Sequence, residues 1–156
     1  MGRLRFCVEA DDETSAKAMA CELHISRKHA YEICNVIRGM KFGNAKKYLQ
    51  EVIEMKRAVP FKKHKRKVGH RRGLNKWYAG RYPVKAAEAI LRLLEDAAAN
   101  ASYKGLDPEE MRIWHIATKK GRTIRGIMPR AFGRATPKNT ETVTVEVILK
   151  GGEGEH

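Results

Sequence analysis

The chain has 156 residues and a formal net charge of +14, from 32 lysines and arginines against 18 acids. This length suits one domain with a real core, so we expect residues 1–156 to form a single domain. No apolar run approaches the ~20 residues of a membrane-spanning helix, and the N-terminus lacks the apolar region of a signal peptide. We therefore expect a soluble, cytoplasmic protein without a membrane span.

The cysteines Cys7, Cys21 and Cys34 are odd in number and have no close-paired spacing. Disulfide frameworks and zinc sites need paired or closely spaced cysteines, and reduced thiols fit a cytosolic protein. The sequence predicts no metal site and no cofactor.

Basic residues are concentrated in two stretches that contain no acid. Residues 56–85 hold twelve lysines and arginines, and residues 111–140 hold eight. A solvated face or a disordered tail is the usual reading of such runs. Neither stretch is terminal, however, and aromatic side chains lie among the charges: Trp77, Tyr78, Tyr82 and Phe132. Cations mixed with aromatic rings are typical of surfaces that bind unpaired bases, which favours RNA over duplex DNA.

Along the chain, residues 1–14 are predicted to be an N-terminal extension. Hydrophobic side chains alternate in it, which indicates an edge strand along the body: Leu4, Phe6 and Val8. Residues 16–25 fit either a helix or a strand. Their alanine content favours a helix, whereas a strand would end at Ser26, a good N-cap, and give the sheet a third strand.

Three helices are predicted from hydrophobic spacing. The first covers residues 26–38 and ends at Gly39. The second begins at the cap residue Asn44 and ends near Lys56, and its inner face holds Ala45, Tyr48, Leu49, Val52 and Ile53. The third begins at Pro83 and ends before Gly105, with Val84, Ala87, Ile90, Leu91, Leu94 and Ala98 facing inward.

Each predicted helix begins with basic side chains: Arg27 and Lys28, Lys46 and Lys47, and Lys85. Cations oppose the helix dipole at that end. A phosphate docked on the free N–H groups would reverse the sign of this interaction, so we expect phosphate contacts at these helix starts.

Residues 59–83 form a basic insertion with neither helical nor strand period. We expect a long loop that a partner outside the chain puts in order. Within it, His64 and His70 are interpreted as phosphate contacts or solvated side chains.

Residues 111–149 are predicted to be a long β-hairpin. The second arm, residues 142–149, alternates valine and leucine with polar residues, which indicates a strand with one buried face. Glycines and prolines between Lys119 and Asn139 should loosen the ladder towards the tip. Glu109 and Glu110 are expected in a turn, Glu141 and Glu146 are expected to face water, and residues 150–156 should be a flexible tail.

No phosphate-binding glycine loop, zinc-protease motif or nucleophile motif is present in the sequence. The protein is therefore not expected to be an enzyme. The leading alternative is an RNA-processing or RNA-modifying enzyme that uses His64, His70 and His115. A chromatin-like DNA architectural protein is the third reading.

Several of these residues together resemble ribosomal protein twenty-two of the large subunit. The resemblance covers residues 15–150. It is carried by Ser26-Arg27-Lys28, Ile37-Arg38-Gly39, Ala97-Ala98-Ala99-Asn100-Ala101 and the tip Pro129-Arg130-Ala131-Phe132-Gly133-Arg134. The insertion, with Val59-Pro60-Phe61, Gly80-Arg81 and Pro83, looks like the archaeal and eukaryotic form of that family. Phe132 stands where bacterial members often carry a basic residue.

The resemblance implies an α+β fold, with three helices packed on a small three-stranded antiparallel sheet and a long protruding β-hairpin. It makes residues 16–25 a strand. The implied partners are large-subunit ribosomal RNA, neighbouring ribosomal proteins and the nascent polypeptide, whose exit tunnel the tip residues Met128, Arg130 and Phe132 would line. The expected RNA-binding residues are Arg27, Lys28, Lys62, Lys63, Lys65, Arg66, Lys67, Arg71, Arg72, Lys76, Trp77, Arg81, Lys119, Lys120, Arg122, Arg125, Arg130, Arg134 and Lys138.

Overall fold

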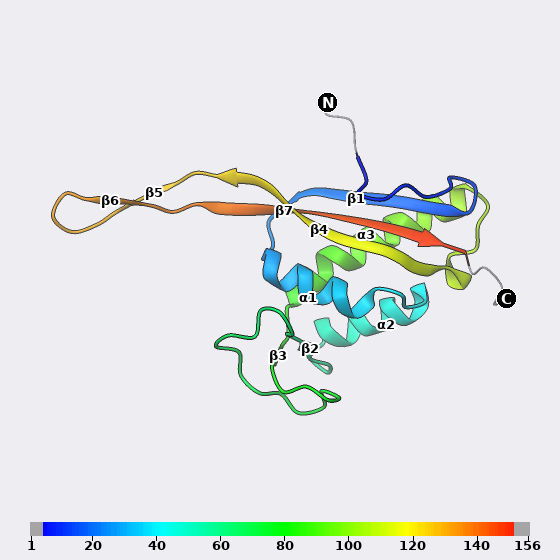
Figure 1. Cartoon of the computed structure of the whole chain (residues 1–156), viewed down its shortest axis with the longest axis horizontal. Coiled ribbons are helices and arrows are strands. Elements are labelled where there is room, and N and C mark those ends of the chain that lie inside the picture. Colours follow the sequence, from blue (N-terminus) through cyan, green and yellow to red (C-terminus); the bar gives the residue numbers. More distant parts are fainter. Residues whose placement is uncertain (1–4, 152–156) are drawn as a thin grey trace.

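A computed structural model describes residues 5–151 and confirms the α+β fold, with three α-helices, a small antiparallel sheet and a long hairpin (Figure 1). Leu4 and residues 152–156 lie outside the described part. The elements are β1 (Ser15–Leu23), α1 (Arg27–Ile37), α2 (Phe42–Ile53), β2 (Val59–Pro60), β3 (Gly80–Arg81), α3 (Val84–Tyr103), the 3₁₀ helix η1 (Pro108–Glu110), β4 (Arg112–Ile124), β5 (Ile127–Pro129), β6 (Ala135–Pro137) and β7 (Thr140–Lys150).

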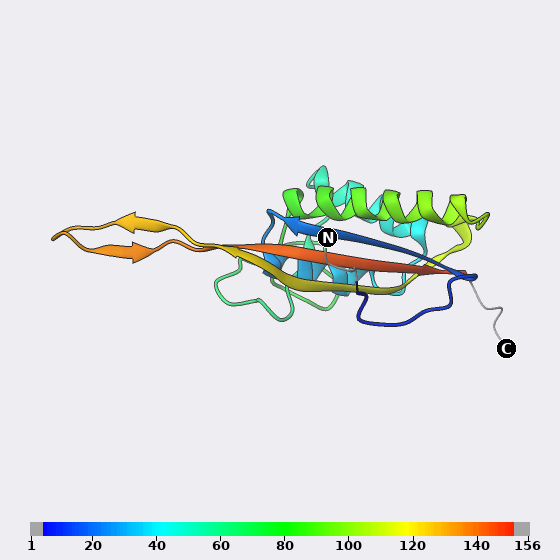
Figure 2. The same cartoon turned by 90° about the horizontal axis from the view of Figure 1, so that it is seen from above.

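The sheet has the antiparallel order β1-β7-β4, so the last strand in sequence lies at its centre. Helix α3 packs along β1 and β7, and α1 packs along β4 (Figures 1 and 2). Ala16 and Ala18 on β1 are buried, as are Ala97 and Ala101 on α3. Side chains this small let the helix lie close to the sheet, which explains why an alanine-rich segment is a strand here: its neighbours override its helix propensity.

The helices confirm most of the predicted inner faces, but two details were wrong. Helix α2 begins at Phe42 and Lys41 is its N-cap, so Asn44 lies within the helix. Phe42 N–H donates to the Met111 carbonyl at 2.9 Å, and its ring is buried. This tertiary contact, invisible to a search for cap residues, sets the helix start.

The inward face of α3 is also rotated from the prediction. Its buried residues are Ala86, Ala87, Ile90, Leu93, Leu94, Ala97 and Ala101. The predicted Val84, Leu91 and Ala98 are only partly buried, because the alanine side of the helix faces β1. Gly105 adopts φ +77°, the left-handed conformation of a residue that ends a helix.

Strand β7 is covered on both faces, contrary to the prediction of one buried face. Glu146 and Ile148 point away from the valine face that packs on the helices, yet both have 0% exposed surface. Residues 5–14 cover them, since this segment crosses the sheet on the side opposite α3 (Figure 2). The segment is irregular rather than the predicted edge strand, because it runs over the face of the sheet and not along its edge.

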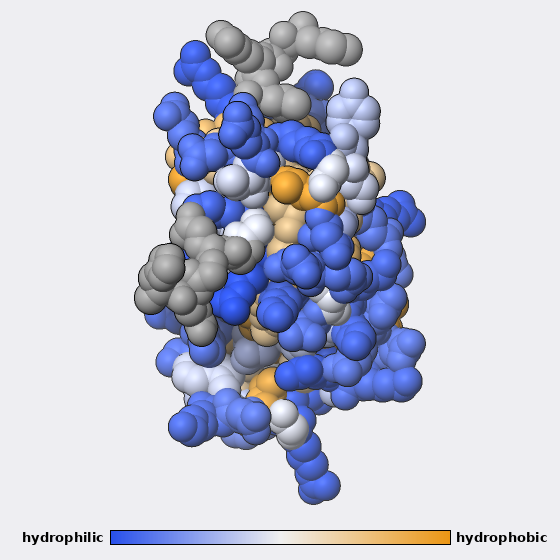
Figure 3. Space-filling view, turned by 90° about the vertical axis from the view of Figure 1, so that its right-hand side faces the viewer, coloured by the Kyte–Doolittle hydropathy of each residue, from blue (hydrophilic) through white to orange (hydrophobic). Residues whose placement is uncertain are grey.

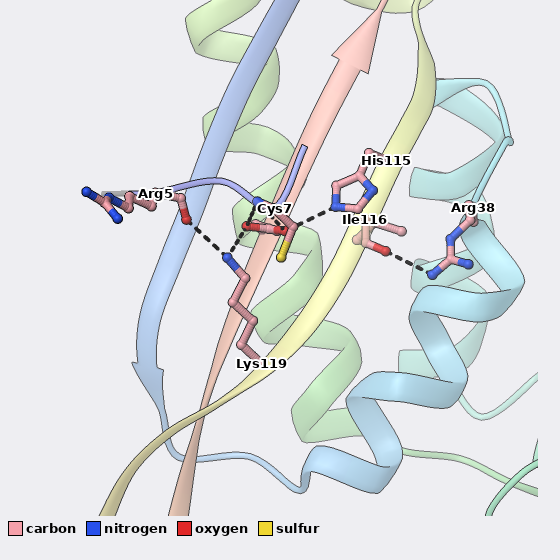
Figure 4. Close-up of polar contacts among 7 residues, drawn as sticks. Arg5, Cys7, Arg38, His115, Ile116 and Lys119 are labelled. Atoms are coloured by element: carbon pink, nitrogen blue, oxygen red, sulfur yellow. Dashed lines mark hydrogen bonds and ion pairs between the residues drawn. The ribbon is translucent and has the colours of Figure 1, made fainter. Parts of the chain in front are cut away.

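The carboxylate of Glu146 ties this N-terminal segment to the sheet (Figure 4). It accepts hydrogen bonds from the Cys7 backbone N–H at 3.2 and 3.3 Å. His115 Nε2 lies 3.1 Å from the same carboxylate, and Lys119 Nζ lies 2.6 Å from it. Lys119 also donates to the Arg5 carbonyl at 3.1 Å. The expectation that Glu146 faces water was therefore wrong, since three residues contact its buried carboxylate: Cys7, His115 and Lys119.

The pKa of Glu146 is held below its ordinary value of 4.5. Burial alone would raise the pKa, but hydrogen bonds from Lys119, Cys7 and His115 outweigh burial. Glu146 is thus a charged carboxylate in the folded protein at neutral pH.

A second buried carboxylate, Glu32 on α1, holds the start of the basic insertion. Its side chain is 1% exposed. The backbone N–H groups of Lys62, Lys63 and His64 donate to it at 3.1, 2.9 and 2.8 Å. The short pair β2–β3 closes the insertion, and Trp77 Nε1 donates to the Phe61 carbonyl at 2.9 Å. The prediction that this loop depends on an outside partner was therefore wrong for its two ends, which the protein itself packs.

The hairpin extends from the body in two sections (Figure 1). The ladder between β4 and β7 reaches Ile124 and Thr140, and β5 and β6 resume it nearer the tip. Between the sections, Lys138 N–H donates to the Gly126 carbonyl at 2.7 Å. A side chain at Gly126 would place its Cβ 2.7 Å from the Lys138 carbonyl oxygen, so only glycine permits this approach. The predicted loosening is confirmed as this interruption.

We predict that Glu146→Gln destabilises the fold by about 1–3 kcal/mol, because it removes a charged hydrogen-bond acceptor from a buried position. Since the folded pKa of Glu146 is lowered, its stabilisation is present above pH 4.5 and is lost as pH falls further. Thermal unfolding from pH 7 to pH 3 should show this loss in the wild type and not in the variant. Glu141→Gln is the matched control, an exposed acid on the same strand paired with Lys120, and should cost less than about 1 kcal/mol. Equal costs for both variants would contradict the anchoring role.

We also predict that Glu32→Gln loosens the basic insertion, because an amide NH₂ group would face a backbone N–H that needs an acceptor. Stability should fall by about 1–3 kcal/mol. Amide exchange of Lys62, Lys63 and His64 should accelerate more than exchange in the sheet. Glu51→Gln, which breaks a surface ion pair with Arg57, should leave these amides unchanged. Unaltered exchange in the Glu32 variant would show that other contacts hold the loop.

Candidate nucleic-acid interface

The basic insertion carries aromatic rings among its cations. Trp77 and Tyr78 are stacked, with ring centroids 5.1 Å apart and planes 22° apart. The ring of His70 meets Tyr78 edge-on at 5.2 Å, and Lys65 Nζ lies 5.6 Å from the Trp77 ring centroid. Tyr78 is 46% exposed. This arrangement offers a flat, partly exposed surface with adjacent positive charge, as single-stranded nucleic acid requires.

The loop cations lie on the surface beside these rings. Eight of the predicted RNA contacts are exposed in this segment: Lys62, Lys63, Lys65, Arg66, Lys67, Arg71, Arg72 and Lys76. Arg81 is also exposed and donates to the Lys67 carbonyl at 3.3 Å. The insertion lies beside α1 in Figure 1 and leaves these side chains to solvent.

The hairpin cations divide into two groups. Lys119 is used within the protein, as part of the Glu146 cluster, and Lys120 lies 2.9 Å from Glu141. The structure thus gives Lys119 a role that the sequence did not predict. The cations farther out are all exposed: Arg122, Arg125, Arg130, Arg134 and Lys138.

The tip turns between Arg130 and Arg134, where the Arg130 N–H donates to the Arg134 carbonyl at 2.8 Å. Phe132 stands in the left-handed region at φ +58° and is 91% exposed. This backbone conformation is unusual for phenylalanine. Packing against the body does not explain it, because the ring is exposed. Met128 is half-buried, and Arg130 Nε donates to Thr136 Oγ1 at 3.2 Å.

The predicted phosphate contacts require basic side chains at the starts of the helices, and the structure places such side chains there for only some of the helices. None of the three N-cap residues, Ser26, Lys41 and Pro83, makes a side-chain capping hydrogen bond. Lys46 and Lys47 lie in the second turn of α2, and Lys46 pairs with Glu95 at 3.2 Å. The prediction that Lys46 and Lys47 stand at a helix start was wrong, because α2 begins earlier, at Phe42. The prediction for the starts of α1 and α3 stands.

The three histidines of the enzyme alternative do not come together. His115 contacts Glu146 on the outer face of the sheet, whereas His64 packs against Tyr31 and His70 packs against Tyr78. Across residues 5–151, no cluster of three or more histidine, cysteine or acidic side chains has the arrangement of a metal site. Within the same residues, no helix combines the length and apolarity needed to cross a membrane.

Figure 3 shows the end of the body that lies opposite the hairpin. Seen from that side, the surface is mostly hydrophilic with small, separated hydrophobic areas (Figure 3).

Sequence reasoning missed Glu32, Glu146, Tyr31 and His29. The two acids looked like surface residues because each stands next to a hydrophobic stripe and not within it. Glu32 had one available signal, since it directly precedes the buried Ile33 and Cys34 on α1. The rings were overlooked because they lie on α1, away from the basic stretch, and Lys63 Nζ reaches Tyr31 at 4.7 Å only after folding.

Comparison with known proteins gives a consistent result over the same region. The family model described as ribosomal protein L22p/L17e matches residues 18–150. The large ribosomal subunit protein uL22 of Methanocella arvoryzae is 58% identical over 149 residues, covering 96% of this chain and 97% of that protein. The proteins of the same name from Archaeoglobus fulgidus and Methanopyrus kandleri are 56% and 60% identical, covering 96% and 91% of this chain and 97% and 90% of theirs. The chain belongs to the ribosomal protein L22p/L17e family.

Proposed function

We propose that this protein is a structural, non-catalytic constituent of the large ribosomal subunit in the cytoplasm. It binds large-subunit ribosomal RNA through the basic insertion and the hairpin, contacts neighbouring ribosomal proteins and supports subunit assembly. The tip of the hairpin lines the exit tunnel and meets the nascent polypeptide. Two findings support this: the shared name of the relatives and the distribution of unpaired positive charge.

The observation that carries the proposal is that the outward-facing cations lack acidic partners. Within the described residues, no loop cation from Lys62 to Lys85 and no hairpin cation from Arg122 to Lys138 forms an ion pair. Some cations outside these two segments are paired, as Lys56 and Arg57 are with Glu54 and Glu51. Phosphates of a nucleic acid backbone would neutralise the remaining cations and release counterions.

RNA accounts for the aromatic surface better than duplex DNA does. The stacked pair Trp77 and Tyr78 presents a ring face of the kind on which unpaired bases stack. The two basic segments also leave the body in different directions (Figure 1). Such a shape suits a folded RNA that surrounds a protein better than one groove of a straight duplex.

The hairpin is long enough to contact molecules far from the body of the protein. Its arms of about a dozen residues, at ~3.3 Å each, give a projection on the order of 40 Å. In the outer part of the hairpin, every residue from 129 to 141 is exposed. A segment that buries nothing of its own contributes little to folding, so its conformation and charge serve contacts with other molecules.

We predict a steep salt dependence for binding to large-subunit RNA, with a log–log slope of several units at roughly 0.7–0.9 per neutralised phosphate. Replacing Arg71 and Arg72 by glutamine should reduce the slope by about 1–2. Lys56→Gln is the control, because Lys56 belongs to the same acid-free stretch but pairs with Glu54 at 2.6 Å, and it should leave the slope unchanged. Titrations from 50 to 300 mM salt measure both, and a nearly flat wild-type response would contradict phosphate-dominated binding.

We also predict that anchoring and tip function separate. Residues 127–137 can be removed and Gly126 joined to Lys138 through Asn-Gly, because the backbones of Gly126 and Lys138 already meet at 2.7 Å. This variant should fold with unchanged stability and enter large subunits, since the deletion removes no core residue. In the full-length protein, a photo-cross-linker at Met128 should reach nascent peptide on translating ribosomes, whereas one at Ile124 should not. Failed incorporation, or nascent-chain cross-links from neither position, would contradict the tunnel role.

A further inference from the structure

A half-open cavity of about 260 Å³ lies between the start of α1 and the basic insertion. Four cations line it: Lys28 from the helix, and Lys63, Arg66 and Arg81 from the insertion. Residues more than fifty positions apart in the sequence thus converge on one hollow. The insertion alone could not form it, because the helix supplies one wall.

The positive charge of this cavity has no internal counterpart. None of its lining residues is acidic, and within residues 5–151 none of the four cations forms an ion pair. The nearby Glu32 carboxylate is occupied by three backbone N–H groups of the insertion. All four cations are exposed to solvent and none is neutralised by an acid of the protein, so this side of the cavity is open to an anionic ligand.

The lining of the cavity is partly apolar. Phe61 is 2% exposed and forms part of the lining together with Val68. The ring of His29 stands edge-on to Phe61, with centroids 5.4 Å apart and planes 74° apart. Burial, and then the charge of Arg81, lower the pKa of His29. A neutral imidazole offers one donor and one acceptor, which suits the edge of a base better than it suits a phosphate.

We propose that this cavity binds one unpaired nucleotide of the RNA, with its base against the partly exposed side chains of Val68 and His29 and its phosphate among Lys28, Lys63, Arg66 and Arg81. This rests on the proposed RNA-binding function and assigns that function a specific subsite. The volume lies just below the roughly 300–1,000 Å³ of pockets that enclose drug-sized ligands. It therefore suits a single nucleotide extruded from a strand and excludes a base pair or a helix.

The charge-neutral test is Val68→Trp, which fills the cavity and leaves the net charge unchanged. Its affinity for large-subunit RNA should fall about tenfold, the effect of losing one stacked base, and its salt slope should fall by no more than about 0.7–0.9, the contribution of one phosphate. Val68→Ala is the matched control at the same position. It leaves the cavity open, so its affinity should stay within about twofold of wild type. Thermal unfolding of both variants confirms that they fold.

A second pair of variants tests the phosphate contacts without touching the apolar lining. Lys63→Gln with Arg66→Gln removes two cations from the cavity, and Lys62→Gln with Arg72→Gln removes two exposed cations of the same segment outside it. The first pair should weaken RNA binding at least fivefold more than the second. Ultraviolet cross-linking of the wild-type complex should place one nucleotide on the peptides that contain His29 or Phe61, and Val68→Trp should abolish this adduct.

Free nucleoside monophosphates, added without RNA while the His29 ring is observed by NMR, distinguish the source of the nucleotide. Binding only at millimolar concentration supports the RNA assignment, whereas saturation at micromolar concentration overturns it in favour of a small-molecule site. If both cavity variants bind RNA as well as their controls do, the subsite is wrong and the RNA-binding function stands. A wild-type protein that binds no large-subunit RNA overturns both.

Discussion

Repulsion between like charges is the constraint to which the rest of this structure responds. Twenty of the 32 lysines and arginines stand in two acid-free stretches, and these charged side chains cannot be buried in a core. The fold sends one stretch outward as a hairpin, in which strand pairing satisfies the backbone while the side chains stay apart in water. It keeps the other against the body through Val59, Phe61 and Ala79, which are buried. Acids are concentrated elsewhere, so the surplus charge faces outward and is available to a polyanion.

Two buried carboxylates hold the insertion and the N-terminal segment against the body, a role that hydrophobic contacts would have in a less charged protein. Glu32 accepts three consecutive backbone N–H groups from the insertion, and Glu146 accepts one from the N-terminal segment together with contacts from His115 and Lys119. Each segment offers few apolar side chains, and backbone N–H groups are available whatever the sequence. A carboxylate buried with such partners is satisfied. This explains how short, polar segments are held in one place without a core of their own.

The periodic elements were predictable because their signals are local. The valine alternation of β7, the inner stripe of α1 and the glycine at the end of α3 all follow from side-chain spacing and backbone preference. The errors share one physical cause. Asn44 was taken as a cap although Phe42 starts its helix through a contact with Met111, 69 positions away in sequence. Glu146 was taken as solvated although residues 5–14 return to cover it. In both cases a distant segment decided the environment, and no local pattern records that.

By itself, the sequence determined the periodic helices and strands, the concentration of positive charge and the segments that carry it, since composition and periodicity are properties of neighbouring residues; the fold class was implied by the resemblance. It also determined the resemblance to the family to which the chain belongs. Only the tertiary structure decided which cations are committed internally, as Lys119 is, and which remain unpaired. It alone brought Lys28 and His29 to the insertion and formed the cavity there. The physical reason is that burial and electrostatic partnership depend on segments far apart in the chain, which meet only when the core between them has packed.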